Sequence, residues 1–203
     1  MTLPVTTMME TKDTELWTLG GAKIDFTNPQ RDMIDMSTVA ISLANQSRFN
    51  GYTNGYYSVA QHSTIMSYWA EDLHEGSNID LARAALLHDA GEAWIGEIVT
   101  PLKRKCPSIK GHETNVTRMI FEDHEIDPDM WDCAEIKELD AIMLNTEVRD
   151  LKENYAPPEP HLCIPDDQVI INPQLPPYAY ANFVMRYNAL FPERRITRPY
   201  IIA

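Results

Sequence analysis

The sequence has few cysteines and few basic residues, and both shortages narrow what the protein can be. Cys106, Cys133 and Cys163 are odd in number, widely spaced and form no CxxC motif, which argues against a disulfide framework. Seventeen Lys and Arg residues stand against 30 Asp and Glu residues, a formal net charge of −13. Such a surface has no general attraction for DNA, RNA or an anionic membrane.

No apolar run approaches the length of a transmembrane helix, and the N-terminal stretch lacks the apolar centre of a signal peptide. We therefore expect a cytoplasmic protein, or one in the host cytoplasm if it is phage-encoded, with neither a nucleic-acid nor a membrane partner. Any phosphate-binding site on so acidic a chain must be a local island of positive charge.

The length of 203 residues suffices for one domain with a sizeable core. We predict an all-α fold with minor irregular or short β segments at its ends. A single domain is expected over 1–203, with a core of about 24–153 and residues 154–203 packed on it as a C-terminal extension. The predicted helices are 35–47, 58–75, 79–94, 112–124, 130–153 and a last one around 183–190, with short strands at 24–26 and 169–171 and an active-site loop over 96–107.

The dipeptide His88-Asp89 follows an apolar helical run that begins at Leu81. Burying such a pair beside Leu86 and Leu87 is costly unless something compensates, and a divalent cation is the usual compensation. A single His or Asp at a helix end is more often a cap or a satisfied core residue. The pair therefore gains its meaning from other segments of the chain.

A helix is predicted to begin at Ser58, because Ser58 and Gln61 have the spacing of a capping box. Val59, His62 and Met66 then recur at helical spacing, which places His62 on the apolar face. Taken alone, His62 is explained equally well as a buried core residue without a metal.

A second acidic position lies in a later apolar stripe. Ile136, Leu139, Asp140, Met143 and Glu147 recur at helical spacing, which predicts that Asp140 occupies a buried position. For Glu147, on the same stripe, we expect either an ion-pair network or a subunit contact.

Three predicted helices thus each direct a metal-competent group inward: His62, the His88-Asp89 pair and Asp140. Two imidazoles and two carboxylates suit a borderline transition metal such as Zn, Co or Mn, with positions left open for water and substrate. Jointly, these residues are hard to explain without a metal.

In this order of ligands the chain resembles the HD superfamily of metal-dependent phosphohydrolases. It is most similar to the small 5'-deoxynucleotidases and the phage-type dATP triphosphohydrolases. The resemblance covers roughly residues 24 to 150, and it implies a helical HD-type bundle and a homo-oligomer, a dimer or a hexamer. Its supporting segments are 47–51 (SRFNG), 58–63 (SVAQHS), 88–92 (HDAGE) and 96–103 (GEIVTPLK).

Each site residue has an expected role. The metal would lower the pKa of bound water towards roughly 7, and Glu92, one turn beyond the ligand pair, suits a base that orients or deprotonates that water. A surface carboxylate is the alternative for Glu92. The resemblance implies that Arg48 grips the substrate phosphate with its planar fork. Lys103 would supply a second positive charge, although Lys103, Arg104 and Lys105 also fit a solvated basic turn.

The chain departs from the family in two places. Glu97 stands where the small HD nucleotidases usually have Asp, which assists the leaving oxygen or water; the longer Glu keeps the charge but reaches further. Phe49 stands where an indole is common. The expected apolar walls for a purine and its sugar are Phe49, Trp94, Ile98 and Pro101, with core packing the alternative for Trp94. We expect His74, His112, His124 and His161 to be surface groups.

Together these features predict a metal-dependent deoxynucleotide phosphohydrolase. The expected reaction converts dATP to deoxyadenosine and triphosphate, with dATP preferred over dGTP and ATP, and with Mg a further cation for a triphosphate substrate. One alternative is a 5'-deoxynucleotidase acting on deoxynucleoside monophosphates. Another, from a different class, is a non-catalytic HD domain that binds nucleotides and regulates a partner.

Overall fold

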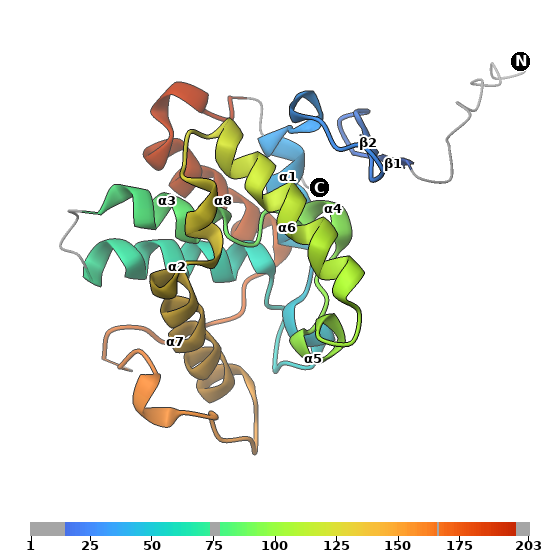
Figure 1. Cartoon of the computed structure of the whole chain (residues 1–203). Coiled ribbons are helices and arrows are strands. Elements are labelled where there is room, and N and C mark those ends of the chain that lie inside the picture. Colours follow the sequence, from blue (N-terminus) through green and yellow to red (C-terminus); the bar gives the residue numbers. More distant parts are fainter. Residues whose placement is uncertain (1–14, 74–77, 166, 198–203) are drawn as a thin grey trace, which may run out of the picture.

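The computed structural model describes residues 15–73, 78–165 and 167–197. It confirms an all-α fold with minor strands (Figure 1). The sheet formed by the described residues is an antiparallel hairpin of β1 (Glu15–Trp17) and β2 (Lys23–Asp25), in which Leu16 lies opposite Ile24. The expected strand at 24–26 is therefore present, displaced by one residue.

Helices make up most of the described chain, and several begin at a capping side chain. The carboxylate of Asp35 accepts the N–H of Ser37 at the start of α1, and Asn78 accepts the N–H of Leu81 at the start of α3. The α-helices are α1 (Met36–Asn45), α2 (Val59–Leu73), α3 (Ile79–Leu87), α4 (Glu92–Ile95), α5 (Thr100–Lys103), α6 (Pro107–Asp123), α7 (Ala134–Leu151) and α8 (Pro176–Leu190). Short 3₁₀ helices are η1 (Arg31–Met33), η2 (Arg48–Gly51), η3 (Pro128–Asp132), η4 (Pro160–Leu162) and η5 (Pro192–Arg194).

The core forms where α2 and α3 lie side by side and α8 packs against them and α1 (Figure 1). Met66, Leu86 and Phe183, one from each of α2, α3 and α8, are fully buried there. The α8 helix comes from the C-terminal stretch outside the resemblance, yet it supplies side chains to the centre of this core. No helix within the described residues is long and apolar enough to cross a membrane.

The predicted helix over 79–94 is wrong in one respect, because α3 ends at Leu87 and α4 begins at Glu92. The turn between them has tight hydrogen bonds three residues apart, from Ala90 N–H to Leu87 O and from Glu92 N–H to Asp89 O. A side chain at Gly91 would place its Cβ 2.4 Å from Thr117 Oγ1. Glycine at this position therefore lets α6 approach the turn that carries the His-Asp pair.

The other departures lie in loops and helix starts. Residues 169–171 form no strand, α6 begins earlier than expected at Pro107, and α5 lies inside the predicted loop. Proline is tolerated in a first helical turn, which explains the starts of both α6 and α8. The Ser58 hydroxyl does accept the N–H of Gln61, but the Gln61 side chain bonds to Asn172 O and the N–H of Gln174 instead of completing the capping box.

Candidate metal centre

The four predicted metal ligands come from α2, the turn after α3, and α7. His62 Nε2 lies 3.3 Å from His88 Nε2 and 3.7 Å from Asp89 Oδ2, and His88 Nε2 lies 3.2 Å from that same oxygen. The ligand atoms of these three residues all lie within 4.8 Å of one another. The structure thus gathers them into a group that could hold a metal ion.

Asp140 lies at the edge of this group. Its Oδ1 is 3.5 Å from His62 Nε2, but it is not part of the compact set of three. Its side chain is 50% exposed, so the expected buried position is wrong. The start of α7 faces a cavity, and Asp140 therefore contacts the cluster from the solvent side.

Hydrogen bonds at Nδ1 of His62 and of His88 determine which ring nitrogen of each histidine faces the cluster. Glu147 Oε1 lies 2.6 Å from His62 Nδ1, and the Ala85 carbonyl lies 2.8 Å from His88 Nδ1. Both acceptors require an N–H at Nδ1, so the neutral rings direct their Nε2 lone pairs toward each other. Two lone pairs at 3.3 Å repel unless a metal ion or a proton lies between them. Two nitrogens at about 2.0–2.1 Å from one tetrahedral ion would be about 3.3 Å apart, which matches the observed separation.

Glu147 organises the side of the site behind His62. Besides His62, it accepts hydrogen bonds from Tyr57 OH at 2.8 Å and from Arg48 Nη2 at 3.3 Å, and it is fully buried. Burial alone would raise the pKa of Glu147, but the adjacent Arg48 and the hydrogen bonds hold it below its ordinary value. Of the two interpretations of Glu147, the structure shows the ion-pair network. The sequence signal was its position two helical turns after Asp140 on one face of α7.

The adjacent ligands His88 and Asp89 shift each other's pKa values in opposite directions. Burial lowers the pKa of His88, but the neighbouring carboxylate of Asp89 outweighs it and raises the value to about 9. Burial would raise the pKa of Asp89, yet His88 and Arg48 hold it well below its usual range. A carboxylate that stays ionised beside two imidazoles is a suitable ligand for a divalent ion.

Arg48 reaches the cluster from η2 and forms a fork between two acids. Its Nη1 lies 3.3 Å from Asp89 Oδ2 and its Nη2 lies 3.3 Å from Glu147 Oε2. Its Nε is buried without a hydrogen-bond partner in the described part of the chain. Phe49 and Asn50 follow with left-handed φ values of 55° and 52°, a sharp turn that holds the arginine inward.

A second group of charges adjoins the metal ligands. Lys103 Nζ lies 2.6 Å from Glu92 Oε1 and 2.8 Å from Glu113 Oε1. The ammonium is therefore occupied by two carboxylates, which changes the expected picture of a free phosphate-binding charge. Burial raises the pKa of Glu92 well above its ordinary value, and the charges of Asp89 and Glu97 raise it further. Glu97 therefore lies near enough to Glu92 for its charge to favour the protonated form of that carboxyl group.

A cavity of about 420 Å³ opens onto these charges. Its lining includes His88, Asp89 and Asp140, together with cationic and aromatic side chains that sequence reasoning had not assigned to the site. The unassigned members are Arg104, Lys110, Lys137 and Trp131, along with Glu113. Trp131 belongs to η3, far from any motif, so no sequence signal pointed to it. A larger cavity of about 720 Å³ lies elsewhere, beside His124 and Tyr187, and holds none of the predicted site residues.

The predicted apolar walls are not brought together at this cavity. Trp94 is buried and packs toward Ile24 and Val39 under the β-hairpin, so core packing, the alternative for this residue, describes it. Ile98 is half-buried and Pro101 is exposed, and neither lines the cavity. Phe49 lies instead beside Arg48, with Lys152 Nζ 4.3 Å from the centre of its ring.

The remaining histidines divide into two kinds. His112 and His161 are exposed, as expected. His124 is buried, so its surface assignment is wrong: its Nδ1 donates to Ile120 O, and its Nε2 accepts from Tyr187 OH on α8. His74 lies outside the described residues.

The fold and the cluster define the protein as an all-α protein with a candidate metal centre of His and Asp ligands. No protein-family model matches the sequence. The chain is 34% identical over 180 residues to the uncharacterized protein YfdR of Escherichia coli. These aligned residues make up 88% of this chain and 96% of YfdR. It is also 37% identical over 87 residues to an uncharacterized protein of Rhodobacter capsulatus, 42% of this chain and 44% of that protein. The chain belongs to the family of YfdR.

Proposed function

We propose that this protein is a metal-dependent phosphohydrolase of the HD type that acts on deoxynucleotides and converts dATP to deoxyadenosine and triphosphate. One observation carries the proposal. His62 and His88 direct Nε2 atoms toward each other at 3.3 Å beside Asp89, with both Nδ1 atoms already committed to acceptors. This arrangement suits a divalent metal ion bound between the two rings, and its ligand order is the one that the HD resemblance implies.

The residues present fit a divalent transition metal such as Zn, Co or Mn. His62, His88 and Asp89 would hold it, with Asp140 as a further ligand at the open edge of the site. When bound, the ion supplies Lewis acidity toward water and toward a phosphoryl oxygen. The half-exposed Asp140 leaves that side of the cluster accessible from the cavity.

The cavity rim favours an anionic substrate that carries an aromatic group. Four cationic side chains, Lys103, Arg104, Lys110 and Lys137, balance the four carboxylates of its lining on a chain whose formal net charge is −13. The cavity is therefore much less negative than the molecule, and a bound metal ion would make it positive. Trp131 lines the same cavity and offers a face on which a base can stack. Stacking alone is tolerant of base identity, so the preference for adenine over guanine stays a prediction.

Different residues would bind the phosphate and transfer the protons during hydrolysis. Arg48 presents a guanidinium beside the ligand cluster, and it would bind a phosphoryl oxygen through the N–H groups that Asp89 and Glu147 leave free. Glu92 and Glu97, whose charges influence each other, would take the proton from the attacking water and supply one to the departing 5'-oxygen. Water thus adds its hydroxyl to the α-phosphorus, and its proton ends on deoxyadenosine.

A substrate panel with product analysis tests the proposal. Metal-loaded protein is incubated with dATP, dGTP, ATP and dAMP, and phosphate is separated from triphosphate by ion chromatography. We expect triphosphate from dATP and a loss of turnover in His88→Gln, with the exposed His112→Gln as matched control. Faster cleavage of dAMP would establish the 5'-deoxynucleotidase instead, and nucleotide binding without turnover would establish a regulatory domain.

A further inference from the structure

A second set of oxygen ligands lies directly beside the His-Asp cluster. Carboxylate oxygens of Asp89, Glu92 and Glu113, from the turn after α3 and from α4 and α6, lie within 4.8 Å of one another. Asp89 belongs to this set and to the set with His62 and His88. The two positions are therefore adjacent and share one carboxylate, which is the arrangement of paired metal ions about 3.5–4 Å apart in phosphoryl-transfer sites.

One of these carboxylates has an oxygen that lacks a partner. The Glu92 side chain is 2% exposed, and its Oε2 has no hydrogen-bond partner in the described ranges of the chain. This oxygen is therefore available as a ligand for a cation.

A cation from the protein already occupies the position. Lys103 Nζ contacts Glu92 at 2.6 Å and Glu113 at 2.8 Å, and its own side chain is only 18% exposed. An ammonium in contact with two carboxylates takes the space in which a divalent ion would bind, and the two positive charges would repel. We propose that Asp89, Glu92 and Glu113 form a second cation site that Lys103 fills, which limits the centre to one metal ion.

The donor atoms indicate which ion would enter if the lysine were absent. All three groups offer carboxylate oxygen, which suits Mg or Mn, whereas the neighbouring histidines favour softer transition metals. The inference rests on the metal centre that the proposed function requires, but not on any nucleotide or on turnover. It also gives Lys103 a role other than the phosphate contact expected from its place in the loop.

Metal stoichiometry of the full chain tests this inference. Wild-type protein and Lys103→Met are stripped of metal, dialysed against Mn²⁺, and measured by mass spectrometry of metal per chain and by electron paramagnetic resonance. We expect about one ion in wild type and about two in Lys103→Met, with the spin coupling of ions about 3.5–4 Å apart. Lys103→Gln removes the same charge with a polar side chain, so the outcome does not depend on how one variant folds.

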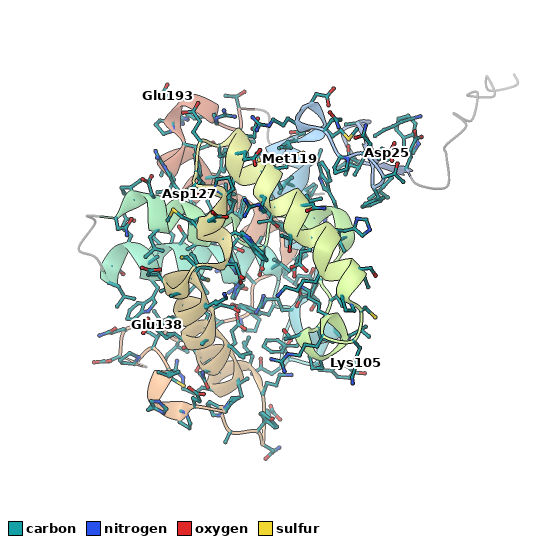
Figure 2. All side chains as sticks on the ribbon, viewed as in Figure 1. Asp25, Lys105, Met119, Asp127, Glu138 and Glu193 are labelled. Carbon is teal, nitrogen blue, oxygen red and sulfur yellow. The ribbon has the colours of Figure 1, made fainter. Side chains whose placement is uncertain are left out.

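Two controls separate the site from a general effect of charge. Lys105→Met removes a lysine from an exposed position at the outer end of the same segment (Figure 2), and we expect it to stay at about one ion. Lys103→Met combined with Glu113→Gln loses a ligand and should return to about one ion. If Lys103→Met and Lys103→Gln both fold and each bind a single ion, this inference is wrong while the proposed function stands. Two ions in wild type would have the same consequence. Absence of any ion in wild type would overturn the metal centre and with it the proposed function.

Discussion

Glu147 holds the His62 ring by a hydrogen bond to Nδ1, and it does so from a fully buried position. We predict that Glu147→Gln lowers metal affinity by about 10- to 100-fold, since the loss of a carboxylate behind a ligand histidine reduces its basicity and its orientation. Competition with a chromogenic chelator measures this affinity. Glu138→Gln is the matched control, because Glu138 is exposed on the same helix (Figure 2). Equal affinities in the two variants would contradict the role of Glu147.

We predict that Arg48 contributes to nucleotide binding through the planar shape of its guanidinium as well as through its charge. Arg48→Lys keeps the charge but cannot span Asp89 and Glu147 while reaching a phosphate. We expect nucleotide affinity to fall by about tenfold, the equivalent of one charge-assisted hydrogen bond of about 1.5 kcal/mol. Calorimetric titration checks this, with metal content unchanged. Arg31→Lys, at an exposed ion pair, should bind like wild type; unaltered affinity in Arg48→Lys would make Arg48 a structural residue.

The Glu92–Glu97 pair predicts a defect in turnover without a defect in binding. Glu92→Gln should retain metal and nucleotide but lose about 10²- to 10⁴-fold in rate, the usual effect of removing a positioned proton-transfer group. Glu97→Asp should change kcat by no more than about tenfold, because the carboxylate is kept with a shorter reach. Steady-state kinetics measures both. If Glu97→Ala turns over like wild type, this carboxyl group has no part in the reaction.

The packing of α6 on the turn between α3 and α4 depends on Gly91. A Cβ there would lie 2.4 Å from Thr117 Oγ1 and 2.9 Å from the Glu113 carbonyl oxygen, which belongs to the backbone and cannot move aside freely. We predict that Gly91→Ala lowers the free energy of unfolding by about 1–3 kcal/mol, the typical cost of overpacking.

Gly111→Ala is the control for this prediction. Gly111 is exposed on α6, and a Cβ added there would meet no atom of the described residues within 4 Å apart from its own helix backbone and chain neighbours. Alanine in a helix should stabilise there by about 0.4–1 kcal/mol. Urea denaturation followed by circular dichroism measures both changes. Equal unfolding free energies for the two variants would mean that α6 does not approach the turn as closely as described.

We expect the burial of His124, between the end of α6 and Tyr187 of α8, to make the stability of the fold sensitive to pH. His124 is buried, and burial lowers its pKa below the ordinary value of 6.5, although a backbone bond to Ile120 and the charge of Asp123 oppose this. The folded state therefore binds a proton less readily than the unfolded state. This contribution to stability is complete above about pH 6.5 and is lost as the pH falls from there through the folded-state pKa.

We predict that the melting temperature of wild type falls more between about pH 7.5 and pH 5 than that of His124→Gln, in which this titration is absent. Thermal denaturation in matched buffers measures the difference. His112→Gln, an exposed substitution on the same helix, should follow wild type. Parallel pH profiles in all three proteins would show that the titration of His124 does not contribute to stability.

Much of the helical framework follows from local pattern. Apolar side chains at helical spacing indicated the helices near α1, α2 and α7, because a face that must be buried repeats every three to four residues. The same reasoning missed the end of α3, since Ala90, Ala93 and Trp94 continue the apolar pattern through a turn. Periodicity reports which side chains are buried, and it does not distinguish a continuous helix from two helices joined by a tight turn.

The order His62, His88-Asp89 and Asp140 was sufficient to propose which residues meet, because each is a metal-competent group within or beside an apolar stretch. The partners behind and around them depended on contacts between distant segments. Glu147 behind His62, the carboxylates around Lys103, and Trp131 beside the cavity are brought in by α7, α6 and η3. Local sequence determines the chemistry that each side chain offers, but charge pairing and cavity shape depend on how helices pack across long separations, which no local pattern encodes.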